Sequence, residues 1–448
     1  MHLFFWFLSL AWAEQPREAV VTDLDRIIAL MEGFHPSPYY VRSAEEIAAT
    51  RDAIAASLPE EVDELVAFRA GHALVTAYSD GHTRIWPGDA IDEAWAQAQR
   101  WPLPVVVSGA SITVSPDIDS PLAGATLESI DGVAVPELVA QLRRHAGRET
   151  DALDAHVLSR SFGYHLWLAT GWSGPFEVTL QDGETQTLSA LPPPAPATSS
   201  SRLPSIEHDT IEGDVAYLKI RDFERMGRRG FLRVYREAFH AFHDADATRA
   251  LIIDVRGHSG GDQRHGARLA RYFAEGPFQD LAYSYWRATP ELKDAFKNSY
   301  VPRGLRWIIP IARPFHPHLR AIYGTDDGEN GRVSYPTRRP RRTRYQPDAV
   351  FVLMDEDTYS AGTCFVAMVA DYDMATLVGR PSGNVANFHA DALLRANLPA
   401  IGAQMQVANS FLVRPSGDLT HAPVQPDVLL DSGEDALQHT LQVLLSAE

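Results

Sequence analysis

Two loops of the sequence carry residue types that are suited to acyl transfer. His258–Asp262 and Asp355–Ser360 each follow an apolar run typical of a buried strand, and each precedes a helical pattern. In α/β sheets, ligands bind at the carboxyl ends of the strands, where helix N-termini offer N–H groups that stabilise negative charge. These two loops are therefore the first place to expect a catalytic site.

Ser360 is the candidate nucleophile of this pair of loops. The adjacent glycines, Gly260 and Gly261, allow the backbone to approach a substrate closely, which suits an oxyanion hole. The same residues also fit a simpler arrangement, in which Ser360 caps a helix and the glycines form a turn. A serine needs a base to become a nucleophile, and spacing alone does not single out one of the 17 histidines.

The elements that must position these loops begin with a helical region over residues 14–98. Leu24, Ile27, Ile28 and Met31 fall on one helix face, with Thr22 or Asp23 available as the N-cap. A capping box, Ser43-Ala-Glu-Glu46, predicts the start of a second helix.

The remainder of the chain divides by composition. Short strands and two Asp-Gly turns predict a β-rich domain over 99–190, and a Pro/Ser-rich stretch predicts a linker over 191–206. Strand–loop–helix repeats predict an α/β layered domain over 207–448. Residues 283–348 show no regular pattern and are expected to be irregular.

The N-terminus predicts export. Leu3–Trp12 is an apolar run of about ten residues, which is too short to cross a bilayer, and it ends in Ala11-Trp12-Ala13. This layout is typical of a cleavable signal peptide over residues 1–13, so we expect a secreted or periplasmic protein. No later segment approaches the length of a membrane span.

Charge and cysteine content exclude several other classes. A formal net charge of −18 opposes binding to phosphate backbones, so no nucleic-acid partner is expected. The single cysteine, Cys364, permits neither an internal disulfide nor a zinc site built on cysteine pairs. The sequence also lacks a His-Glu-x-x-His motif and a phosphate-binding glycine loop, so neither a metal nor a cofactor is expected.

Five regions, in this order, resemble the tail-specific or C-terminal-processing serine peptidases, particularly their tricorn-like branch. These are Phe34–Pro36 with Asp80-Gly-His-Thr83, then Leu122–Val135, Leu251–Gly261, Thr358–Gly362 with Ala375–Gly379, and finally Pro423–Asp427. The resemblance spans most of the chain after the expected signal peptide.

The resemblance implies a multidomain α/β protein with a spiral ββα catalytic domain like that of crotonases and Clp proteases. A PDZ-like domain over 99–190 and an N-terminal helical domain over 14–98 would accompany it. The resemblance implies that His82 is the base for Ser360, and that the N–H groups of Gly260 or Gly261 and of Ala361 hold the oxyanion. The implied substrate is a peptide or an unfolded protein, and the oligomeric state stays open.

The sequence departs from the family pattern at three places. His258 stands where the glycine loop usually has asparagine, and Gly81 stands where tricorn has a serine. A glutamate often precedes the closing motif, whereas this chain has Thr420-His421 there, with Asp418 nearby. Asp80, Asp418 and His421 are therefore all candidates for the residue that orients His82.

Histidine is favoured over lysine as the base. The other main branch of the family uses a lysine that follows the serine, but all three lysines of this chain precede Ser360. Two other functions fit the same residues. One is an inactive protein of this fold that binds peptide ends or apolar ligands, and the other is a serine esterase.

Overall fold

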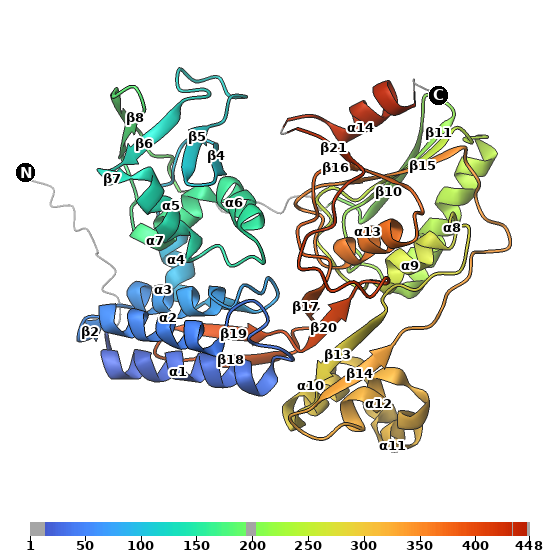
Figure 1. Ribbon diagram of the computed structural model, residues 1–448, viewed down its shortest axis with the longest axis horizontal. Helices are drawn as coiled ribbons and strands as arrows, with labels where there is room; N and C mark the ends of the chain where they lie inside the picture. Colours follow the sequence, from blue (N-terminus) through green and yellow to red (C-terminus); the bar gives the residue numbers. More distant parts are fainter. Residues whose placement is uncertain (1–13, 194–202, 432, 446–448) are drawn as a thin grey trace, which may run out of the picture. The chain divides into compact units, whose positions relative to one another are not determined.

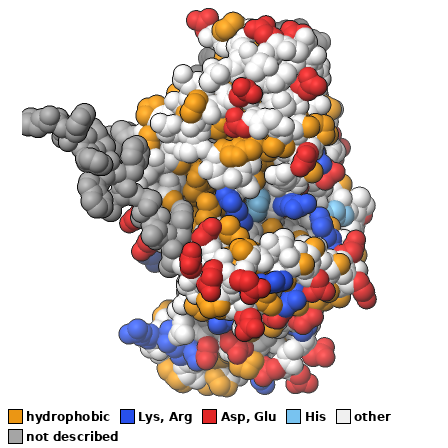
Figure 2. All heavy atoms as spheres, turned by 90° about the vertical axis from the view of Figure 1, so that its left-hand side faces the viewer, with side chains coloured by type: hydrophobic (Ala, Val, Ile, Leu, Met, Phe, Trp, Pro, Cys, Tyr) orange, Lys and Arg blue, Asp and Glu red, His pale blue; other side chains and the backbone are white. Residues whose placement is uncertain are grey.

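The computed structural model describes residues 14–193, 203–431 and 433–445, and the chain forms two compact units (Figure 1). Unit 1 comprises residues 1–196 and 392–408, and unit 2 comprises residues 197–391 and 409–448. The predicted signal peptide lies outside the described residues, as does most of the predicted linker. Acidic side chains are spread over the face drawn in Figure 2, as the net charge leads one to expect.

Unit 1 begins with three helices, α1 (Arg17–Phe34), α2 (Ala44–Ser57) and α3 (Glu64–Thr76). Of the predicted apolar face of α1, Leu24, Ile27 and Met31 are fully buried in their common core, and Ile28 is partly buried against it. The predicted capping box is confirmed, since Ser43 Oγ accepts the Glu46 N–H and the Glu46 carboxylate accepts the Ser43 N–H at 2.8 Å. The expected N-cap of α1 is wrong, because the helix begins at Arg17 and contains both Thr22 and Asp23.

A hairpin that is distant in sequence completes this part of unit 1. Strands β18 (Leu394–Leu398) and β19 (Ala403–Val407) pair with each other, and β19 pairs antiparallel with β3 (Arg84–Pro87), which is followed by α4 (Asp89–Gln97). The buried Asp23 carboxylate accepts the Ala400 N–H at 2.7 Å and the Ile401 N–H at 3.2 Å. The helical domain expected from the sequence, residues 14–98, is contiguous and therefore lacks this hairpin from much later in the chain.

The rest of unit 1 is a sheet covered by helices, with its own core. Its strands are β4 (Val105–Ser108), β5 (Ser111–Val114), β6 (Thr126–Ile130), β7 (Val133–Ala134), β8 (Phe176–Leu180) and β9 (Thr185–Leu188), and its helices are α5 (Val135–Arg143), α6 (Asp151–Arg160) and α7 (Phe162–Thr170). Both predicted Asp-Gly turns join strands here. The PDZ-like assignment of this region stays a prediction.

Unit 2 is built on a mainly parallel sheet with the strand order β10-β11-β12-β15-β16-β21. The strands are β10 (Ile206–Ile211), β11 (Val215–Ile220), β12 (Ala250–Asp254), β15 (Ala349–Met354), β16 (Thr376–Gly379) and β21 (Val428–Leu429). Helices α8 (Arg228–Asp244), α9 (Arg264–Ala270) and α13 (Ala361–Asp371) contribute to its largest core, and α14 (Ala436–His439) lies near the end of the chain. The continuous apolar runs predicted for β12 and β15 are buried, as expected of central parallel strands.

A second, antiparallel sheet of unit 2 has the order β14-β13-β20-β17. Its strands are β13 (Tyr283–Arg287), β14 (Asn330–Ser334), β17 (Phe388–Ala390) and β20 (Ser410–Val413). Between β13 and β14 lie α10 (Pro290–Tyr300), α11 (Ile309–Ala312) and α12 (Pro317–Tyr323), and we call residues 290–323 the helical lobe. The expectation that 283–348 is irregular is therefore wrong. Prolines divide this region into helices too short to show a period, and each of the three helices has a proline in its first turn.

We predict that Asp23→Ala destabilises unit 1 by about 2–4 kcal/mol, because two buried N–H groups at the hairpin tip lose their acceptor. Urea unfolding followed by tryptophan fluorescence measures the loss. Asp25→Ala is the matched control, since that exposed carboxylate only pairs with Arg51 and its removal should cost less than about 1 kcal/mol. Equal losses for the two variants would contradict the role given to Asp23.

Candidate active site

Ser360 occupies a strained turn between β15 and α13. Its backbone has φ +55° and ψ −113°, a combination that a non-glycine residue rarely adopts. The Ser360 N–H donates to Asn384 Oδ1 at 2.7 Å, and the neighbouring Tyr359 N–H donates to the His258 carbonyl at 2.9 Å. These contacts hold the serine at the N-terminus of α13, as the sequence predicts.

The glycine loop after β12 lies directly against this serine. A Cβ atom built on Gly260 would lie 2.9 Å from Ser360 Cβ and 3.3 Å from Ser360 Oγ. On Gly261 it would lie 2.4 Å from the Phe223 carbonyl carbon. Both glycines also have φ near +120°, at +116° and +119°, so no other residue fits either position without strain.

Two backbone N–H groups have no acceptor among the described residues: that of Gly261, which follows Gly260, and that of Ala361, which follows Ser360. The Gly260 N–H differs, because it donates to His258 Nδ1 at 3.1 Å. Of the two glycine amides expected as alternatives for an oxyanion hole, the Gly261 amide is thus the one available to a ligand.

His258 supports this loop from within. It is fully buried, its ring meets the Phe223 ring edge-on at 4.4 Å, and a Cβ on Gly362 would lie 2.8 Å from its Nδ1. Burial lowers the pKa of His258 to about 4, so the ring is neutral near pH 7. A neutral ring whose Nδ1 accepts the Gly260 N–H carries its proton on Nε2.

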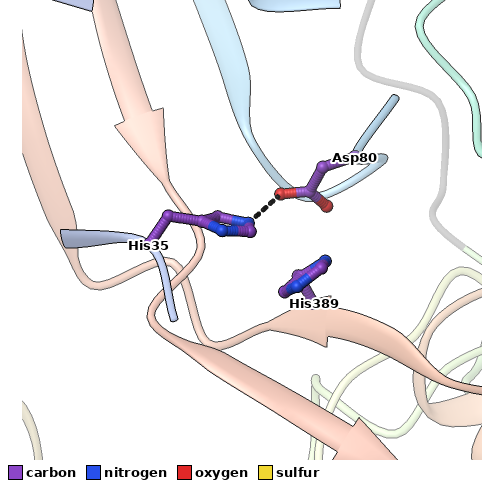
Figure 3. Close-up of side chains that lie close together, drawn as sticks. All are labelled: His35, Asp80 and His389. Carbon is purple, nitrogen blue, oxygen red and sulfur yellow. Dashed lines mark hydrogen bonds and ion pairs between the residues drawn. The ribbon is translucent and has the colours of Figure 1, made fainter. Parts of the chain in front are cut away.

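In unit 1, the segment Asp80–Thr83 forms a compact turn before β3. The Asp80 carboxylate accepts the His82 N–H at 2.9 Å and the Thr83 N–H at 3.1 Å, and it lies 3.3 Å from His35 Nε2 (Figure 3). These contacts of Asp80 fix the backbone of His82. Burial lowers the pKa of the His82 ring to about 3, and the charge of Asp80 partly opposes this shift.

The closing segment lies beside the residue that holds the Ser360 N–H. Val385, next to Asn384, forms a β-bridge with Pro423, which follows His421 by two residues. The exposed Asp418 carboxylate instead accepts the N–H and hydroxyl of Thr420 within its own turn. Sequence reasoning missed Asn384, although the polar Ser382-Gly-Asn384 turn after β16 was a signal for it.

Each lysine of the chain pairs with a carboxylate. Lys219 Nζ lies 2.9 Å from Asp254, while Lys293 pairs with Asp327 at 2.6 Å and Lys297 with Asp294 at 2.5 Å. These ion pairs engage all three lysine ammonium groups of the chain. This agrees with the order of residues in the sequence, which favours histidine as the base.

A cavity of about 850 Å³ in unit 2 begins at the glycine loop. Gly261 and Asp262 form part of one wall, and residues of α10 and α12 contribute another. The lining includes the aromatic side chains of Phe223, Trp286 and Tyr335 as well as charged groups, among them Arg264, which pairs with Asp262 at 2.7 Å. The cavity can receive a substrate side chain next to the Gly261 N–H.

This arrangement suits one class of chemistry. A serine held at a helix N-terminus, next to two backbone N–H groups with no acceptor, matches a nucleophile and an oxyanion hole. The arrangement therefore matches the one expected of a serine-type hydrolase.

Comparison with known proteins relates one segment of the chain to a family. Residues 214–430, just under half of the chain, match the model of peptidase family S41, a family of serine-type peptidases. No curated protein sequence gives a significant match.

Among solved structures, the serine-to-alanine mutant of CPAF is similar at a TM-score of 0.64 and 15% identity, with 96% of each chain covered. Mature CPAF is similar at a TM-score of 0.60 and 14% identity, covering 92% of this chain and 93% of that one. A complex of mature CPAF with lactacystin gives a TM-score of 0.57 at 14% identity, covering 92% of this chain and 94% of that one.

The family match and these likenesses support a mixed α/β peptidase fold. The expected spiral ββα, PDZ-like and N-terminal helical domains stay predictions. None of the described helices combines the length and the apolar composition needed to cross a membrane.

We predict that Gly260→Ala slows labelling of Ser360 by a fluorophosphonate by about 100-fold or more, because the new methyl group meets the serine side chain. Labelling is measured by intact-protein mass against time. Gly257→Ala is the matched control, since Gly257 also has a positive φ, +69°, but has open space around its Cβ position. Similar rates for the two variants would show that close approach to Ser360 is not required.

Proposed function

We propose that this protein hydrolyses peptide bonds through an acyl-enzyme, with Ser360 as the nucleophile and His82 as its base. The observation that carries the proposal is the close approach of Gly260 to Ser360, together with the Gly261 and Ala361 N–H groups, which follow these two residues and have no acceptor among the described residues. The proposed substrates are peptides or unfolded proteins.

In the proposed reaction, Ser360 Oγ attacks the peptide carbonyl carbon while His82 accepts the hydroxyl proton. The Gly261 and Ala361 N–H groups donate to the oxyanion of the tetrahedral intermediate. The C–N bond then breaks, and the amine leaves with the proton held by His82. Water next attacks the ester, again losing its proton to His82, and Ser360 regains a proton as the peptide acid departs.

Chain connectivity supports the choice of His82. The neighbouring Thr83 hydroxyl accepts the N–H of Ala408, the last residue of the hairpin that belongs to unit 1. The next residue, Asn409, leads into β20 of unit 2, which pairs with β17. Asn384, the acceptor of the Ser360 N–H, lies only a few residues before β17 in the sequence. A series of hydrogen bonds and short chain segments therefore links the segment that carries the base to the one that carries the nucleophile.

His258 has a positioning role in this proposal. By accepting the Gly260 N–H, it turns the loop so that the next amide, that of Gly261, is left for the substrate. Its lowered pKa keeps it neutral and able to accept that hydrogen bond at neutral pH.

We predict that Ser360→Ala and His82→Ala each reduce kcat/KM on an unfolded protein by about 10³-fold or more, and that the double variant loses little further activity. Groups that act as one unit give such non-additive losses. Circular dichroism checks that the variants fold, and Ser259→Ala is the control for Ser360→Ala.

Further measurements distinguish the proposed peptidase from an esterase and from an inactive binding protein. Losses that multiply in the double variant would remove His82 from the catalytic unit. Hydrolysis of aryl esters without cleavage of protein substrates would indicate an esterase. Failure of the wild-type protein to react with a fluorophosphonate would indicate an inactive binding protein.

We predict that kcat/KM changes less than about threefold between pH 7 and pH 5. Only neutral histidine accepts a proton, and a histidine with the ordinary pKa near 6.5 would be almost entirely protonated at pH 5. With a pKa of about 3, His82 stays neutral over this range, so the loss of activity begins only as pH falls towards that value. Tryptophan fluorescence at each pH excludes unfolding, and a decline centred near pH 6.5 in folded protein would contradict the assignment.

A further inference from the structure

The helical lobe has two faces of different character. Phe296, Leu319 and Ile322 are buried towards the rest of unit 2. Over residues 307–315 the lobe exposes large apolar side chains, with Trp307 at 71%, Ile311 at 65% and Phe315 at 86% of their full accessible surface. Because they fall within one short stretch, we treat these three side chains as one exposed apolar face of the lobe, of the kind that contacts a partner.

The charge of the lobe is opposite to that of the whole chain. Residues 295–325 contain no Asp or Glu, although the protein carries a formal charge of −18. The four arginines of this stretch are Arg303, Arg306, Arg313 and Arg320. Arg306 and Arg313 donate to backbone carbonyls, and none of the four pairs with a carboxylate among the described residues.

We propose that this face of the helical lobe binds the surface of an anionic lipid bilayer. Exposed tryptophan, phenylalanine and isoleucine side chains enter the boundary between headgroups and acyl chains, and nearby arginines contact the anionic headgroups. The lobe lies on the membrane rather than crossing it, since its helices are short and are interrupted by prolines.

Charge favours a lipid surface over a second copy of the chain. A symmetric dimer through this face would bring the same unpaired arginines of both copies together, and such like charges oppose association. An anionic bilayer offers complementary charge and an apolar layer at once.

The lobe also contributes residues to the cavity beside the glycine loop. Tyr300, His316 and His318 of the lobe line the cavity that begins at Gly261. Docking would therefore bring the cavity near the membrane surface, where it could receive protein segments that emerge from the bilayer. The docking itself does not depend on the proposed peptidase activity.

Co-sedimentation with vesicles tests the proposal, using full-length Ser360→Ala protein so that catalysis plays no part. We predict binding to phosphatidylcholine vesicles that contain about one third phosphatidylglycerol, little binding to pure phosphatidylcholine, and loss of binding in about 0.5 M NaCl. Arg303→Gln with Arg313→Gln should weaken binding about 30-fold, and Trp307→Ala with Phe315→Ala by about tenfold or more.

Matched double variants at exposed positions elsewhere control for general charge and apolar area. Arg229→Gln with Arg236→Gln and Leu203→Ala with Leu429→Ala should bind vesicles like the parent protein. Equal weakening by these controls, or no binding to anionic vesicles, overturns the proposal. Analytical ultracentrifugation without lipid gives the remaining outcome: if the Trp307/Phe315 variant converts a dimer to monomers and no vesicle binding occurs, the face is a contact between copies.

Discussion

The contact between the glycine loop and Ser360 is the constraint on which the site depends. With a Cβ at Gly260 excluded by the serine side chain, and one at Gly261 excluded by the Phe223 backbone, the loop has one path past the nucleophile. That path directs the Gly260 N–H to His258 and leaves the next amide to a ligand. The strained backbone of Ser360 is held by the same surroundings, as is common where function requires an unfavourable conformation.

The second feature of the fold is that neither unit is continuous in sequence. The hairpin of β18 and β19 leaves unit 2, completes the sheet that contains β3, and is fixed at its tip by the buried Asp23. The turn that holds His82 thus rests on strands that come from both ends of the chain. Folding of unit 1 requires residues beyond position 391, so it cannot be complete until most of the chain has been made.

The helical lobe combines residues that line a cavity with exposed residues that are apolar or basic. Its inner residues help to line the cavity beside the glycine loop, whereas its outer face is apolar and basic. Packing within unit 2 explains why the inner residues of the lobe are apolar. It does not explain the apolar side chains of Trp307 and Phe315, which are exposed. The exposed apolar side chains point to a partner, and the arginines of the lobe limit the chemistry of that partner.

The sequence by itself determined the local elements and the family. Apolar runs, the Ser43 capping box and the Asp-Gly turns identified strands, a helix start and turns, because these signals depend on near neighbours. It also placed Ser360 and the glycines in loops after buried strands. Only the tertiary structure showed that the Gly260 amide is occupied by His258, that Asn384 holds Ser360, and that Asp23 anchors a hairpin almost 380 residues away. It also showed the helices of the lobe, which prolines cut too short to display a period. These features arise from contacts between residues distant in the chain, and the spacing of residue types carries no record of which distant partners meet.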